Sequence, residues 1–78
     1  MSHETLDATR MLCPMPVIRT QNKIETLQVG DTLTVICTDP GAKNDIPAWC
    51  RINGHKVLEI TTDDQRREIA ITVEVCAT

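Results

Sequence analysis

The sequence has almost no aromatic side chains: phenylalanine and tyrosine are absent, and Trp49 is the only aromatic residue in 78. The stacking platforms that proteins use to hold single-stranded nucleic acid are therefore missing. A basic face for the phosphate backbone is not indicated either, because the formal net charge is −3 and the pI is about 5.2. We therefore expect no direct binding to nucleic acid.

Long hydrophobic runs are also missing. No apolar stretch approaches the roughly 20 residues that cross a bilayer, so we expect no association with a membrane. The first residues, Met1–Glu4, lack the basic start and the apolar core of a secretory signal. Together these features predict a cytoplasmic protein.

The four cysteines lie far apart in the chain, at positions 13, 37, 50 and 76. In a reducing compartment such cysteines are expected to be free thiols rather than two disulfides. Metal sites usually draw their ligands from closely spaced pairs, which this sequence lacks, and His3 and His55 are isolated. We therefore expect neither a bound metal nor a structural zinc site.

Hydrophobic residues make up 41% of the chain, which is typical of a folded protein. A length of 78 residues predicts one domain, residues 1–78, with a small core of Ile, Val, Leu and Met. Hydrophobic patterns predict the order β-α-β-α-β-β. The expected strands are Glu4–Ala8, Thr32–Thr38, Lys56–Thr62 and Arg67–Val75, and the first expected helix is Pro14–Leu27.

The second helix is expected to end before Gly54, which suits the residue after a helix. Its start is open, because Pro47 does not suit a helix interior. Either Asp45 caps the helix and Pro47 lies in the first turn, or a distorted turn from Ala42 comes first. Cys50 lies on the apolar face of this helix and is expected in the core, as is Cys37 in the second strand.

The last strand predicts how the elements pack. Its apolar residues alternate strictly with mostly polar ones, so one face of the sheet is buried. Both helices must also bury an apolar face. We therefore predict an α+β fold, a two-layer α/β sandwich with both helices on one face of a four-stranded mixed sheet. The last two strands are expected to form an antiparallel hairpin.

The stretch Cys13-Pro14-Met15-Pro16 lies between the first strand and the first helix. Proline costs least in the first helical turn, so Cys13 is predicted at the N-cap, Pro14 at N1 and Pro16 at N3. The helix dipole would favour a thiolate at Cys13, and Arg10 would add positive charge. Because the prolines remove two N–H donors, this thiolate would be exposed and nucleophilic. Alternatively, Cys13 is a small buried apolar residue.

Three apolar residues flank Cys13, namely Met11, Leu12 and Met15. They form either a docking surface for a partner or part of the core. No histidine or carboxylate is evident as a base for Cys13, which disfavours a cysteine hydrolase. Cys76, two residues from the end, is expected to be exposed or frayed.

Several motifs together resemble the TusA/SirA-like family of small sulfur carriers, and the resemblance covers nearly the whole chain. It rests on chain length, element order and five segments: Leu6-Asp7-Ala8, Cys13-Pro14-Met15-Pro16, Asp39-Pro40, Asp45-Ile46-Pro47-Ala48-Trp49-Cys50 and Gly54-His55. The resemblance implies the two-layer fold, which the C-terminal domain of translation initiation factor 3 also has. It further implies a sulfurtransferase without a bound cofactor, in which Cys13 carries sulfur as a persulfide.

The resemblance also implies partners. Cys13 would accept sulfur from a pyridoxal-phosphate cysteine desulfurase or a rhodanese-type donor and pass it to an acceptor protein. In part of the family the sulfur ends in the 2-thiouridine of tRNA, and other relatives serve sulfur oxidation or the molybdenum cofactor. We expect a monomer or a weak dimer.

The alternative function is a thiol-based redox-regulatory module, in which Cys13 forms a sulfenate or a disulfide with Cys37, Cys50 or Cys76.

Overall fold

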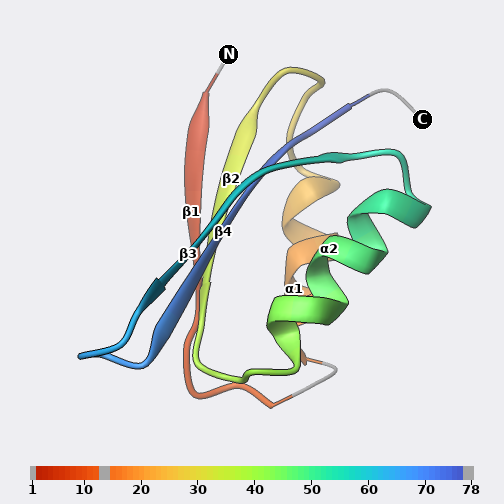
Figure 1. Ribbon diagram of the computed structural model, residues 1–78. Coiled ribbons are helices and arrows are strands. Elements are labelled where there is room, and N and C mark those ends of the chain that lie inside the picture. The colour runs from red at the N-terminus through yellow and green to blue at the C-terminus, as the bar shows by residue number, and fades with distance from the viewer. Residues whose placement is uncertain (1, 13–14, 77–78) are drawn as a thin grey trace.

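The computed structural model describes residues 2–12 and 15–76, which form two layers (Figure 1). Two helices cover one face of a four-stranded mixed sheet, so the predicted α+β sandwich is confirmed. Neither described helix is long and apolar enough to cross a membrane. The elements are β1 (His3–Ala8), α1 (Met15–Ile24), β2 (Thr32–Cys37), α2 (Ala42–Ile52), β3 (Lys56–Asp63) and β4 (Glu68–Glu74).

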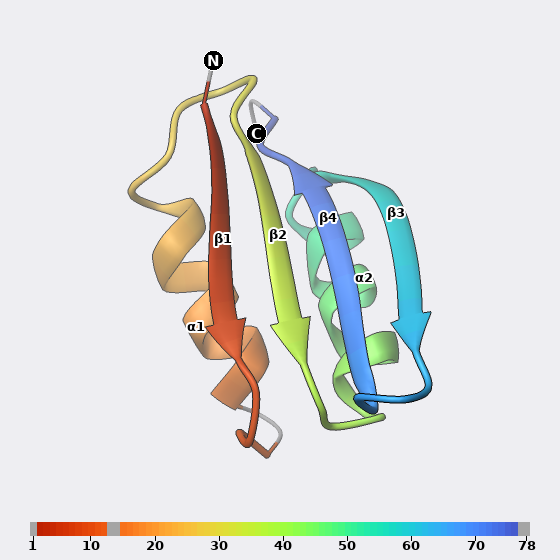
Figure 2. The same ribbon diagram turned by 90° about the vertical axis from the view of Figure 1, so that its left-hand side faces the viewer.

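The strand order in the sheet is β1-β2-β4-β3. β1 and β2 are parallel, whereas β4 runs antiparallel to both of its neighbours, β2 and β3. The carboxyl ends of β1 and β2 therefore lie at one end of the sheet, where the connections to α1 and α2 leave (Figure 2). The predicted hairpin of the last two strands is confirmed.

The core lies between the sheet and the helices, and strict alternation in the two central strands builds it. Leu33 of β2 pairs with Val73 of β4, Val35 pairs with Ile71, and all four side chains are fully buried. Burial of each such side chain contributes about 1.5–3 kcal/mol. The helices close the core with Ile24, Ala42, Ile46 and Cys50.

The opposite face of the sheet is mostly polar, although Ile36 and Ala70 also lie on it. The ring nitrogens of His3 lie 2.6 Å from Thr32 Oγ1 and 3.2 Å from Thr34 Oγ1, and Thr34 Oγ1 lies 3.0 Å from Thr72 Oγ1. These hydrogen bonds connect β1, β2 and β4 through the exposed His3 and three partly buried threonines.

The first helix is shorter than its pattern predicted. α1 ends at Ile24 and not at Leu27, because the chain tightens into a turn in which the Leu27 N–H donates to the Ile24 carbonyl at 3.0 Å. The Thr26 hydroxyl donates to the Lys23 carbonyl at 2.6 Å, so this carbonyl at the end of the helix has a side-chain donor. Leu27 still packs against the core from this turn.

The second helix begins early, at Ala42, and contains Pro47 in its interior. Of the two predicted starts, the one from Ala42 is correct. The first turn is tight, because the N–H groups of Ala42, Lys43 and Asn44 each donate to the carbonyl three residues earlier. Pro47 lies buried against the core, so packing compensates for its missing N–H.

The end of α2 matches the prediction. Gly54 has φ 81°, the left-handed conformation that glycine adopts without a steric penalty. The His55 N–H donates to the Cys50 carbonyl at 2.8 Å, and the Gly54 N–H donates to the Arg51 carbonyl at 3.4 Å. These two bonds define a Schellman motif, which turns the chain from α2 into β3.

Asp31 closes the end of the sheet opposite the carboxyl ends of β1 and β2. Its buried carboxylate accepts hydrogen bonds from the backbone N–H of Gln28 and of Ser2, both at 2.9 Å. The bond from Gln28, followed by that from Ser2, lowers the pKa of this carboxyl below 3.8. The ionised form therefore joins the first strand to the start of the second.

We predict that Asp31→Asn destabilises the protein at neutral pH, because the amide turns a donor toward a backbone N–H. The pKa of Asp31 is lower in the folded protein than in the unfolded chain, where it is 3.8. The stability that the carboxylate contributes is therefore fully present above pH 3.8 and is lost as the pH falls through the folded-state pKa. The difference in free energy of unfolding between the proteins, measured in urea, should shrink below pH 3.8. An unchanged difference in acid would show that ionisation of Asp31 contributes nothing.

Candidate functional site

The candidate site is the connection from β1 to α1. Cys13 and Pro14 lie outside the described residues, so the predicted N-cap thiolate stays a prediction. Their neighbours locate the connection at the carboxyl ends of β1 and β2 (Figure 2). There the Met15 N–H donates to the Leu12 carbonyl at 2.9 Å, and Met15 begins α1.

Asp7, next to the last residue of β1, holds the turn that leads toward the site. Its Oδ1 accepts the Thr9 hydroxyl at 2.6 Å and the Thr9 N–H at 3.0 Å. These hydrogen bonds, with a smaller contribution from the nearby Arg10 charge, lower the pKa of the Asp7 carboxyl. The carboxylate therefore stays ionised and holds the turn at neutral pH.

Arg10 has a left-handed backbone conformation, with φ 64°. This costs a residue with a side chain about 1–2 kcal/mol. A hydrogen bond from the Arg10 N–H to Thr38 Oγ1, at 2.9 Å, offsets part of this cost. The bond also ties the connection to the end of β2.

The apolar residues that flank Cys13 divide into two groups. Met11 is half-buried and packs against the core, whereas Leu12 is 76% exposed and Met15 is 41% exposed. Of the two alternatives, the core position holds for Met11, whereas Leu12 and Met15 are exposed and their role in docking stays a prediction. Ile18, which the sequence interpretation did not assign to the site, is also 41% exposed. Its position one residue after Val17 places it off the buried face of α1.

Pro16 lies in the first turn of α1 and packs into the core. It is fully buried, and its carbonyl accepts the buried Thr20 hydroxyl at 2.7 Å. This packing fixes the first turn of the helix against the core. Pro16 is therefore not part of the exposed surface that Leu12, Met15 and Ile18 form.

Two of the other cysteines are core residues, as predicted. Cys37 is fully buried, and its Sγ lies 3.7 Å from the Ile69 carbonyl. Burial, and to a lesser extent the negative charge of Asp39, raises the pKa of this thiol. Burial also raises the pKa of the fully buried Cys50 to about 11. Both side chains are thus protonated at neutral pH.

Cys76 is partly buried and hydrogen-bonded, so the predicted frayed conformation is wrong for this residue. Its N–H donates to His55 Nδ1 at 3.2 Å, and its Sγ lies 3.5 Å from the Glu74 carbonyl. The His55 ring also stacks on Trp49, with the ring centroids 5.6 Å apart. This cluster lies at the end of the sheet opposite Leu12 and Met15, so His55 is too remote to act as a base there.

A sequence model of the family described as sulfurtransferase TusA matches residues 4–75. The chain belongs to this family. TusA of Pseudomonas paraeruginosa, a sulfur carrier protein, is 46% identical over 54 residues, which cover 69% of this chain and 68% of that protein. YrkI of Bacillus subtilis, also named as a sulfur carrier, is 45% identical over 62 residues, which cover 80% and 83%.

The fold has a close match among solved structures. The crystal structure of a SirA-like protein from Desulfitobacterium hafniense aligns with a TM-score of 0.83 and covers 95% of this chain and 99% of that chain. At 24% sequence identity this similarity shows the shared fold. The family match thus places the chain among the TusA-family sulfur carriers, and the structural match confirms its fold.

We predict that iodoacetamide leaves Cys37 and Cys50 unmodified in the folded protein at neutral pH. Both thiols are fully buried, and burial raises the pKa of each. Peptide mass mapping after a short reaction measures the modification, and a urea-unfolded sample, in which both must react, is the control. Equal rates at Cys50 with and without urea would contradict its burial.

Proposed function

We propose that this TusA-family protein relays sulfur as a persulfide on Cys13. One observation carries the proposal. The thiols of Cys37 and Cys50 are buried, and Cys76 lies at the end of the sheet opposite the connection from β1 to α1. In the sequence, Cys13 follows the exposed Leu12 and comes two residues before Met15, where α1 begins. It is thus the cysteine that a second protein would reach.

The proposed transfer has two balanced steps. The Cys13 thiolate attacks the terminal sulfur of a donor persulfide, and the donor's S–S bond breaks. The donor leaves as a thiolate, and Cys13 now carries the extra sulfur. An acceptor thiolate then attacks that terminal sulfur and releases the Cys13 thiolate. No external oxidant or reductant is consumed, and the chain's residues only need to keep the thiolate formed and accessible.

The proposed environment of the thiol comes from the ends of β1 and α1. The α1 dipole and the Arg10 charge favour the thiolate. Pro14 and Pro16 lack N–H groups, so they leave its lone pairs open to a donor. The exposed apolar surface of Leu12, Met15 and Ile18 would be covered by the donor or acceptor during transfer.

The proposed donor is a cysteine desulfurase or a rhodanese-type protein, and the proposed acceptor is another protein of the relay, with tRNA 2-thiouridine as one destination. The sulfur-carrier names of the relatives support this class of partner. The net charge of −3 favours delivery through a protein over direct contact with RNA. We further propose that residues 1–78 act as one domain in the cytoplasm.

The redox-regulatory alternative is less well supported. Cys37 and Cys50 are fully buried in the core, and Cys76 lies at the end of the sheet opposite the connection that contains Cys13. A disulfide requires Cα atoms within about 7 Å. The observed burial therefore favours the relay.

We predict that Cys13→Ser abolishes sulfur acceptance and leaves the fold intact. Wild type incubated with free cysteine and a pyridoxal-phosphate cysteine desulfurase should gain one sulfur atom in intact mass, and a thiol reductant should remove it. The matched control is Cys76→Ser, which should gain sulfur like wild type. A folded Cys13→Ser protein that still gains sulfur would overturn the role of Cys13.

We predict that Ile18→Glu slows sulfur transfer by about tenfold or more, because it places a charge in the proposed docking surface. The effect should be a higher donor concentration at half-maximal rate. Ile52→Glu is the matched control, since Ile52 is 84% exposed on α2 at the opposite end of the molecule. Equal rates for both variants would exclude this surface from docking.

A further inference from the structure

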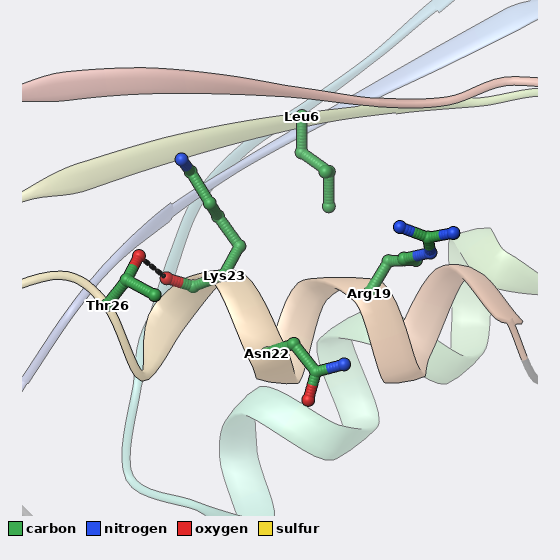
Figure 3. A pocket seen from close by; sticks show the side chains of 5 residues that line it. All are labelled: Leu6, Arg19, Asn22, Lys23 and Thr26. Carbon is green, nitrogen blue, oxygen red and sulfur yellow. Dashed lines mark hydrogen bonds between the residues drawn. The ribbon is translucent and has the colours of Figure 1, made fainter.

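A shallow pocket of about 260 Å³ lies between the outer edge of β1 and α1 (Figure 3). Leu6 of β1 points into it, with Arg19 and Lys23 of α1 on either side. The sequence interpretation gave this pocket no role, and the proposed chemistry at Cys13 does not use it. Its lining residues are Leu6, Arg19, Asn22, Lys23 and Thr26.

The pocket is basic although the chain as a whole is acidic. Lys23 Nζ lies 3.2 Å from Glu4 Oε1, so a carboxylate on the helix side of β1 reaches a cation of α1. Arg19 forms no ion pair with any residue in the described ranges 2–12 and 15–76. One cation at this edge is thus already paired and the next is open to an acidic partner.

The spacing of these cations fits an extended chain. Arg19 and Lys23 are four residues apart on a helix, which is about 6 Å along its axis. Alternate side chains of a strand repeat every 6.8 Å or so. A strand placed beside β1 would therefore present every second side chain to α1 at nearly the interval of Arg19 and Lys23.

β1 is also the better edge to receive a strand. It pairs with β2 through six consecutive residues without a register shift. At the other edge, β3 has a register shift between Val57 and Glu59, a feature that hinders edge pairing. β1 leads into the connection that contains Cys13, so a strand bound along this edge would end at the same connection.

We propose that the edge of β1 binds an extended acidic segment of the sulfur donor, which adds a fifth strand to the sheet and pairs a carboxylate with Arg19. The backbone of β1 supplies the hydrogen bonds, and Arg19 selects the acidic side chain and the register. This inference rests on the proposed relay for the identity of the occupant. It makes β1 the element that aligns the donor with Cys13.

The test uses a capped hexapeptide of alternating glutamate and valine, titrated into the ¹⁵N-labelled protein at low salt. Amide signals of β1 and α1 should shift and saturate, and the glutamine analogue should bind more weakly. Arg19→Glu should raise the dissociation constant about fivefold, as expected for an exposed ion pair, and added salt should reduce this difference. Lys56→Glu, with the same charge change at the other edge, should bind like wild type.

Two results would overturn the inference: shifts that do not map to β1 and α1, or equal affinity of wild type and Arg19→Glu. A link to the donor comes from the sulfur-transfer assay. There Arg19→Glu should raise the desulfurase concentration at half-maximal rate about fivefold and leave the maximal rate unchanged. An unchanged half-maximal concentration would exclude the donor as the occupant.

The outcomes separate this inference from the relay itself. If wild type gains sulfur but the peptide experiment fails, the strand site is wrong and the relay stands. If wild type binds the peptide at β1 through Arg19 but gains no sulfur from any donor, the relay is wrong and the edge remains a strand-binding site.

Discussion

The parallel pairing of β1 with β2 is the constraint on which the rest of this structure depends. Six residue pairs, from His3 with Thr32 to Ala8 with Cys37, fix the register. Two parallel neighbours cannot be joined by a hairpin, so the chain must cross over between them, and α1 is that crossover. The connection that contains Cys13 therefore has to leave from the carboxyl end of β1. The hydrogen bonds of Asp7 and Arg10 then set its path, and α1 begins there.

The same sheet topology sets the environments of the three described cysteines. Cys37 faces the helices from β2 and Cys50 faces the sheet from α2, so both are buried and their pKa values are raised. Because β4 runs antiparallel to β2, Cys76 lies at the far end of the sheet, where His55 accepts its N–H. A sulfur carrier benefits from this arrangement, since sulfur that moved to a buried or distant thiol would be lost to the acceptor.

Much of the fold follows from the sequence because its signals are local. Alternation in β4 predicted a half-buried strand, and Gly54 predicted the end of α2. The start of α2 could not be decided, because Pro47 argues against an early start and only its burial in the core shows how the cost is offset. For the proposed site, Cys13 and its flanking residues rest on the motif alone. The exposure of Ile18 and the pocket at Arg19 were not identifiable from the sequence, since both depend on which side of α1 meets the edge strand.

The most direct test of a nucleophilic Cys13 at the start of α1 is the pH dependence of its alkylation in the folded protein. The rate at Cys13 should be followed by peptide mass mapping, with Cys13→Ser as the control that lacks the fast reaction. The expected result is a thiol that titrates well below the ordinary cysteine pKa of about 8.5 and reacts faster than Cys76 at neutral pH. A Cys13 pKa at or above about 8.5 would contradict a thiolate stabilised by the helix.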